Sequence, residues 1–143
     1  MPPPKLKSRK KPLKVILDSN ALFVPLQFKI DIFEEIKKLL NMKFELIILP
    51  PILRELEELA EKNSPKMQKN ASYALRTAKK CKSFELDEEY VDSLPDETIF
   101  QVASEWKCPV FTNDRELRKR LRNINVPVIY VRQKSRLEID GRI

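Results

Sequence analysis

The sequence predicts one three-layer α/β domain, in which a central twisted parallel sheet of four to five strands carries helices on both faces. Two observations predict this fold. Short apolar runs, typical of strands buried on both faces, alternate along the chain with amphipathic helical segments. The chain also has 143 residues, 42% of them hydrophobic, which is enough for one full hydrophobic core.

The first two strands are each followed by a helix. Val15 to Leu17 form an apolar run too short for a helix, and Asp18 follows directly. After Pro25, apolar residues at i, i+3, i+4 spacing predict a helix that buries one face. Glu45 to Leu49 predict the second strand, and Pro50 stops it and opens the next helix.

The middle of the chain adds two helices. A helix is predicted over Lys66 to Lys80, with alanines on its inner side and cations on its outer side. Phe84 to Leu86 are interpreted as a short edge strand, and residues 87–92 as an acidic loop or short helix. Ser93 to Glu97 open a further helix that continues to Trp106.

The last part repeats the strand and helix alternation. Pro109 to Thr112 predict a buried strand, followed by a basic helix with Leu117 and Leu121 inside. Val126 to Val131 predict the final strand. Three regions follow: a flexible basic arm over residues 1–13, the α/β domain over 14–131, and a basic tail over 132–143.

Composition excludes several classes of function. The chain has no histidine, which excludes ordinary zinc sites and Ser-His-Asp or Cys-His catalysis. Its single glycine excludes a glycine-rich phosphate loop and a dinucleotide-binding fingerprint. Its two cysteines form no CxxC motif and are interpreted as buried apolar side chains. No apolar run approaches the ~20 residues of a membrane span, and no secretory signal is present, so we expect a cytoplasmic protein without membrane partners.

The charge balance points to a polyanionic partner. Lysine and arginine number 28 against 21 acidic residues, which gives a formal net charge of +7. A basic excess of this kind suits nucleic acid, although it also serves solubility.

Four acidic residues share one position relative to the predicted strands. Each follows an apolar strand or lies in the first turns of the helix after it; they are Asp18, Glu55, Asp96 and Asp114. In a parallel sheet these points lie at one edge, where ligands bind. Converging carboxylates repel one another unless a cation neutralises them, and Mg²⁺ or Mn²⁺ accepts such oxygen ligands. The alternative for Asp18 and Asp96 is stabilisation of a helix N-terminus.

These motifs resemble the PIN-domain ribonucleases from Lys14 to Val131. The resemblance rests on the apolar run before Asp18-Ser19-Asn20, on Pro-x-x-x-x-Glu55, on Asp96-x-x-Ile99, and on Thr112-Asn113-Asp114-Arg115-x-Leu117. It implies cleavage of single-stranded RNA with one or two Mg²⁺ or Mn²⁺ ions.

The resemblance also implies a role for each matching residue. Asp18, Asp96 and Asp114 would be metal ligands, and Glu55 a ligand or a water-mediated partner. Glu97 stands where related nucleases often have a second aspartate, and it could reach a metal. Four polar residues would orient the acids: Ser19, Asn20, Thr112 and Asn113.

Residues 114–123 and 126–131 narrow the resemblance to one group within the PIN-domain ribonucleases. They are similar to the PIN nuclease of the eukaryotic small-subunit processome, which matures 18S rRNA, and the chain resembles a compact archaeal-type relative. This similarity implies precursor rRNA as substrate and ribosome-assembly factors as partners, and the family implies a homodimer. The expected RNA contacts are the cations Arg115, Arg118, Lys119, Arg122, Lys10 and Lys11.

Two other functions stay open. PIN domains of similar size act as toxins held by an antitoxin, and a small neighbouring antitoxin protein would then be the partner. A non-catalytic RNA-binding scaffold would depend on the basic helix alone, with the acids as relics.

Overall fold

A computed structural model describes residues 11–83 and 94–143 as an α/β fold. Within these residues six strands form one sheet in the order β3-β2-β1-β4-β5-β6. The strands are β1 Leu13–Leu17, β2 Phe44–Ile48, β3 Lys82–Ser83, β4 Val110–Phe111, β5 Val128–Arg132 and β6 Arg136–Asp140. All neighbouring strands are parallel except β5 and β6. The predicted α/β fold with a mostly parallel sheet is therefore confirmed.

Strand β1 lies in the middle of the sheet and is covered on both faces. Successive side chains of a strand point to opposite faces, and Val15, Ile16 and Leu17 are all fully buried. Ile16 is in register with Ile47 of β2 and with Val110 of β4. The residue that follows β1 is therefore held at the carboxyl edge of the sheet from both sides.

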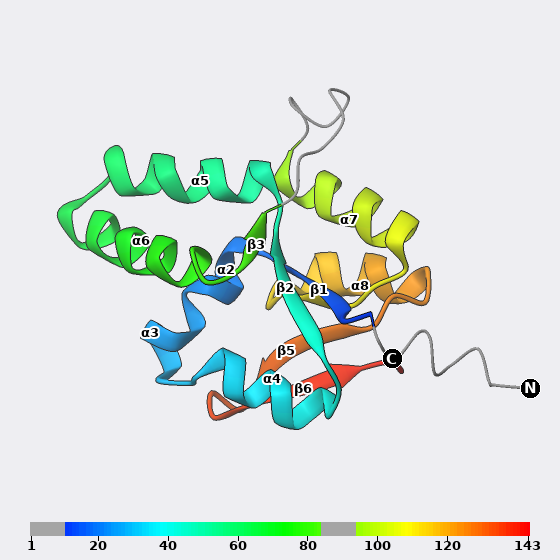
Figure 1. The fold of residues 1–143 in the computed structure, drawn as a ribbon. Helices are drawn as coiled ribbons and strands as arrows, with labels where there is room; N and C mark the ends of the chain where they lie inside the picture. Colours follow the sequence, from blue (N-terminus) through cyan, green and yellow to red (C-terminus); the bar gives the residue numbers. More distant parts are fainter. Residues whose placement is uncertain (1–10, 84–93) are drawn as a thin grey trace, which may run out of the picture.

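Helices connect the strands and supply the remaining core. They are α2 Ser19–Leu22, α3 Val24–Phe28, α4 Ile32–Leu40, α5 Pro50–Glu61, α6 Pro65–Ala78, α7 Pro95–Trp106 and α8 Arg115–Asn123. Helices α5 and α6 lie side by side, and α7 contacts both α5 and α8 (Figure 1). Helix α4 buries its apolar stripe of Ile32, Ile36 and Leu40. Among the residues that the structure describes, no helix combines the length and apolar character needed to cross a membrane.

Three segments differ from the sequence-based expectations or lie outside the description. Residues 132–143, predicted as a basic tail, contain β6, which pairs antiparallel with β5 and buries Leu137. The turn after Asp18 forms the two short helices α2 and α3 before α4 begins. The predicted edge strand at Phe84 to Leu86 and the acidic segment 87–92 lie outside the described residues, while β3 pairs with β2 just before them.

Both cysteines serve as apolar side chains. Cys108 is buried, and burial raises the pKa of its thiol to about 11. Burial likewise raises the pKa of the half-buried Cys81 to about 12. The reactive thiolate is therefore scarce at neutral pH, as the sequence-based interpretation requires.

The left-handed backbone conformation of Lys29 can be tested by substitution. It ends α3 in the left-handed conformation, with φ 55° and ψ 41°, where glycine is usual. A left-handed conformation costs a non-glycine residue about 1–2 kcal/mol. Substitution by glycine removes this cost, but the greater backbone entropy of glycine in the unfolded chain offsets part of the gain. Lys29→Gly should therefore raise the free energy of unfolding by about 0.5–1 kcal/mol in urea denaturation. Lys69→Gly, at an exposed position inside α6, is the matched control and should lower it by about 1 kcal/mol. Equal losses in both variants would contradict the prediction.

Candidate active site

Asp18 directly follows β1 and is a buried carboxylate with defined hydrogen bonds. Its side chain is only 3% exposed. Oδ1 accepts a hydrogen bond from the Ser19 backbone N–H at 2.7 Å, which caps α2. Oδ2 accepts from the Thr112 hydroxyl at 2.7 Å and from Asn20 Nδ2 at 3.1 Å. Asp18 therefore has the expected N-cap role and is also bonded to the neighbouring strand through Thr112.

The Thr112-Asn113-Asp114 turn joins the carboxyl ends of β4 and β5 to this carboxylate. The Asp114 N–H donates to Thr112 Oγ1 at 3.1 Å. The Asn113 N–H donates to Asn20 Oδ1 at 3.0 Å, and Asn113 Oδ1 accepts from Val131 N–H at 2.8 Å. Each of the residues predicted to support the acids thus contacts the site through a backbone or side-chain hydrogen bond.

Asp114 begins helix α8 as its N-cap. Its Oδ1 accepts from the backbone N–H groups of Glu116 at 2.9 Å and Leu117 at 3.2 Å. These bonds fix the carboxylate at the carboxyl end of β4, one strand away from Asp18. Local capping chemistry therefore places both aspartates at the same edge of the sheet.

The four predicted acids act on one another electrostatically. Burial raises the pKa of Asp18, the bonds from Thr112 and Ser19 oppose this, and the charges of Glu55 and Asp114 raise the pKa further. Burial also raises the pKa of Asp96, and the charges of Asp18 and Asp114 add to the rise. The charges of these carboxylates thus act on one another, and a cation between them would reduce their repulsion.

The donor set suits a hard divalent cation. Its atoms are carboxylate oxygens, the ligands that Mg²⁺ and Mn²⁺ prefer, and Mg²⁺ is often held by one or two carboxylates plus waters. Across residues 11–83 and 94–143, no three carboxylate or thiol side chains lie close enough together to form a complete ligand cluster. Asp18, Glu55, Asp96 and Asp114 therefore do not form a complete metal site in this structure, and the fit to a cation rests on the chemistry of their carboxylates and on their mutual repulsion.

Glu97 makes a different contact from the one expected of a metal ligand. Its two oxygens accept hydrogen bonds from Arg120 Nη1 at 2.6 Å and Nη2 at 3.2 Å, and Arg120 lowers its pKa. The Arg120 guanidinium also lies over the Phe100 ring, 4.4 Å from its centroid, and its charge opposes the rise in the pKa of Asp96. Arg120 is a residue near the acids that the sequence did not single out.

The predicted RNA-binding cations fall into three groups. Arg118 and Arg122 donate to Asp140 of β6 at 2.9 and 3.2 Å, and Arg118 also lies over the Tyr130 ring at 3.8 Å. The exposed cations of α8 without an acidic partner in the described part of the chain are Arg115 and Lys119. Lys11 lies near the amino end of β1, at the opposite edge from Asp18, and Lys10 lies outside the described residues.

Comparison with known proteins gives consistent matches. The model of a family described as "PIN like domain" matches residues 15–134. Ribonuclease VapC4 of Methanocaldococcus jannaschii is 38% identical over 91% of this chain and 98% of its own length. The rRNA-processing protein fcf1 of Schizosaccharomyces pombe is 33% identical over 89% of this chain, but only 64% of its own length is matched. A solved structure of the PIN domain endonuclease Utp24 has a TM-score of 0.76 and 30% identity, covering 92% of this chain and 94% of that chain.

The Thr112 hydroxyl gives a direct test of the site's construction. Thr112→Val keeps the side-chain shape but removes the donor to Asp18 and the acceptor for the Asp114 N–H. A hydrogen bond to a buried carboxylate is worth about 2 kcal/mol, so the free energy of unfolding should fall by about that amount in urea. Thr98→Val is the matched control. Thr98 is equally buried, but its hydroxyl donates only to the Leu94 carbonyl, and the loss should be about 1 kcal/mol or less. A Thr112 loss no larger than that of Thr98 would contradict the network.

Proposed function

The chain belongs to the PIN domain family, and from that premise we propose that it is a divalent-metal-dependent endoribonuclease that hydrolyses RNA phosphodiester bonds. One observation carries the proposal. The carboxylate of Asp18 is buried at the carboxyl end of β1 and bonded to Thr112, and Asp114 is fixed at the same edge of the sheet as the N-cap of α8. Without a cation these carboxylates repel one another, and a bound cation would reduce that repulsion.

The residues of the site have different proposed roles. Asp18, Asp96 and Asp114 would hold Mg²⁺ or Mn²⁺, and Glu55 would bind directly or through a water. The bound cation would supply an activated water and neutralise charge that develops at phosphorus. Thr112, Asn20 and Ser19 keep the Asp18 oxygens in fixed directions, so the chain itself contributes orientation.

Precursor rRNA is the substrate that we propose, in ribosome biogenesis and in the cytosol. The resemblance to fcf1, named as an rRNA-processing protein, supports it, together with the basic outer face of α8. On this proposal the partners are ribosome-assembly factors, and two copies of the chain form a homodimer.

A toxin of a toxin–antitoxin pair is the second candidate. It is favoured by the 38% identity to Ribonuclease VapC4, which is matched over 98% of its length. Growth arrest on expression, relieved by a small protein encoded nearby, would select this role. A non-catalytic RNA-binding scaffold would instead bind RNA with strong salt dependence, unaffected by EDTA, without cleavage under any metal.

The acids give the main test of catalysis. Asp18→Asn and Asp114→Asn should each lower the rate of RNA cleavage in Mg²⁺ or Mn²⁺ by at least about 100-fold, because each removes a charge that holds the cation. The rate is followed with an end-labelled RNA on a denaturing gel. Glu58→Gln, an exposed acid on the same helix as Glu55, is the control and should cleave normally. Unchanged cleavage by both aspartate variants would exclude the proposal.

Asp140 gives a separate test of the α8 surface. It neutralises Arg118 and Arg122, so Asp140→Asn should leave two guanidinium groups available to phosphates. RNA affinity should then rise about threefold at low salt, with a steeper salt dependence, while stability falls by less than about 1 kcal/mol. Fluorescence anisotropy measures the affinity. Glu138→Gln, which removes an acid from the same strand next to Arg132 and Arg136, serves as the control. Unchanged or weaker binding of Asp140→Asn would place the RNA elsewhere.

A further inference from the structure

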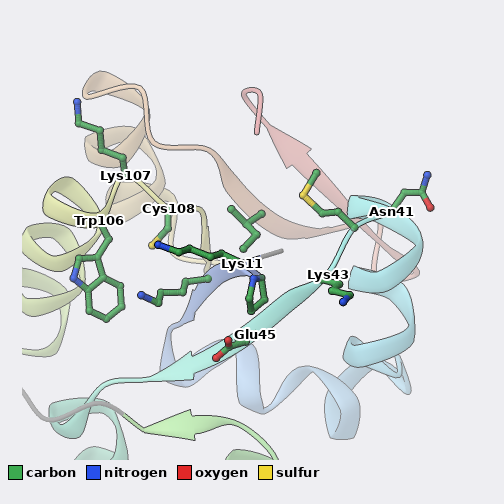
Figure 2. Close-up of a pocket in the computed structure, with 11 residues that line it drawn as sticks. Lys11, Asn41, Lys43, Glu45, Trp106, Lys107 and Cys108 are labelled. Atoms are coloured by element: carbon green, nitrogen blue, oxygen red, sulfur yellow. The ribbon is translucent and has the colours of Figure 1, made fainter. Parts of the chain in front are cut away.

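A groove lies at the amino ends of the central strands, on the opposite edge of the sheet from Asp18. Its main hollow has a volume of about 1210 Å³ and is lined where β1, β2 and β4 begin, by Leu13, Lys43 and Cys108 among others (Figure 2). A second hollow of about 580 Å³ shares Met42 and Lys43 with it and extends toward Lys37 of α4. Because they share lining residues, the two hollows are adjacent.

Cations dominate the lining of this groove. Five lysines line the two hollows: Lys11, Lys14, Lys37, Lys43 and Lys107. Among the described lining residues the one acid is Glu45, and its carboxylate already pairs with Lys82 at 2.9 Å.

Three of the lysines that line the groove are exposed. Lys11, Lys43 and Lys107 are exposed, and each lacks an acidic partner in the part of the chain that is described. The groove is therefore a local concentration of unpaired positive charge.

The helix ends at this edge do not cancel that charge. Asn41 is the C-cap of α4 and Lys107 is the C-cap of α7, and each helix C-terminus carries about half a negative charge. The lysines could serve only to balance these ends. Lys11, Lys43 and Lys107 line the main hollow, however, and Glu45 is already paired with Lys82, so about two positive charges remain after both helix ends are subtracted. An anion is therefore still favoured there.

The floor of the groove is apolar and partly accessible. Met42 is 49% exposed, and Trp106 is half-buried with Lys14 Nζ 4.9 Å from its ring centroid. Apolar and aromatic surface between lysines suits a nucleic-acid strand, because ribose and base contact the floor while phosphates meet the ammonium groups.

We propose that this groove binds the backbone of the RNA substrate at a distance from the acids. The proposal rests on the proposed ribonuclease function and extends it to a second RNA contact. The five residues of β1 separate the two edges by roughly 15 Å, so only RNA that extends well beyond the cleaved bond can reach both.

The experiment compares RNA of two lengths in the inactive Asp18→Asn background. Fluorescence anisotropy measures the affinity for single strands of about 6 and about 20 nucleotides over a range of salt. The test variant carries Lys11→Ala, Lys43→Ala and Lys107→Ala. The matched control removes the same charge from three exposed lysines of α5 and α6, with Lys62→Ala, Lys66→Ala and Lys69→Ala. Met42→Glu, an exposed substitution that adds a negative charge to the groove, is a second variant in case the triple variant is unstable.

The expected result is specific to the groove and to long RNA. The triple groove variant should bind the long strand at least about tenfold more weakly, and the slope of log K against log salt should fall by about 2, while short-strand binding is unchanged. Met42→Glu should weaken long-strand binding in the same direction.

Three outcomes would overturn the proposal. One is an equal loss in the Lys62, Lys66 and Lys69 control. Another is an equal loss for both RNA lengths. The third is unchanged binding of the long strand by both the triple groove variant and Met42→Glu, which would place the RNA elsewhere on the protein.

The two proposals can fail separately. Cleavage of the short strand by the protein with Asp18 intact tests the ribonuclease function without the groove. Absent cleavage with a groove-specific loss of binding would reject the catalytic proposal and keep the RNA contact.

Discussion

The hydrogen bond from the Thr112 hydroxyl to Asp18 is the contact on which the candidate site depends. It joins the carboxyl ends of two neighbouring strands through side chains separated by 94 residues. Burial of a carboxylate costs several kcal/mol, and the bonds from Thr112, Asn20 and Ser19 offset part of that cost. The protein therefore keeps an acid where packing alone would favour an apolar residue, and the strands and turns around it hold it in place.

The charge of the molecule is distributed between two edges of the sheet. At the carboxyl edge, acids repel one another, and Arg120 and Glu97 join α7 to α8 beside them. At the amino edge, lysines gather around an accessible hollow. The net charge of +7 is therefore distributed unevenly over the molecule. Its arrangement suits a long polyanion that contacts both edges, with the reactive chemistry at only one of them.

Much of the fold and of the acid constellation follows from local sequence patterns. Apolar runs mark the parallel strands, and a parallel topology places whatever follows each strand at one edge, so Asp18 and Asp114 could be placed together. Strand β6 was missed because its turn lacks the usual signal. Gln133 and Lys134 adopt φ values of 53° and 57°, which asparagine and glycine normally supply in a hairpin. The alternation of Leu137 and Ile139 with charged residues was a period-two signal that the basic composition concealed.

Other features depend on tertiary placement and have no local signal. The pairing of Arg120 with Glu97 requires α7 and α8 to pack together, and the pairing of Arg118 with Asp140 requires β6. The lysine groove combines residues from the starts of three strands, so no continuous basic stretch of the sequence predicts the groove.

The central claim is that Asp18, Asp96 and Asp114 share a divalent cation at the carboxyl edge of the sheet. Anomalous diffraction from crystals soaked in Mn²⁺ tests it most directly. The account predicts an anomalous peak between these carboxylates, and its loss in crystals of Asp18→Asn. The claim would be contradicted if anomalous peaks appeared only at other surface acids. It would also be contradicted if soaked crystals showed no peak and the carboxylates of Asp18, Asp96 and Asp114 remained apart.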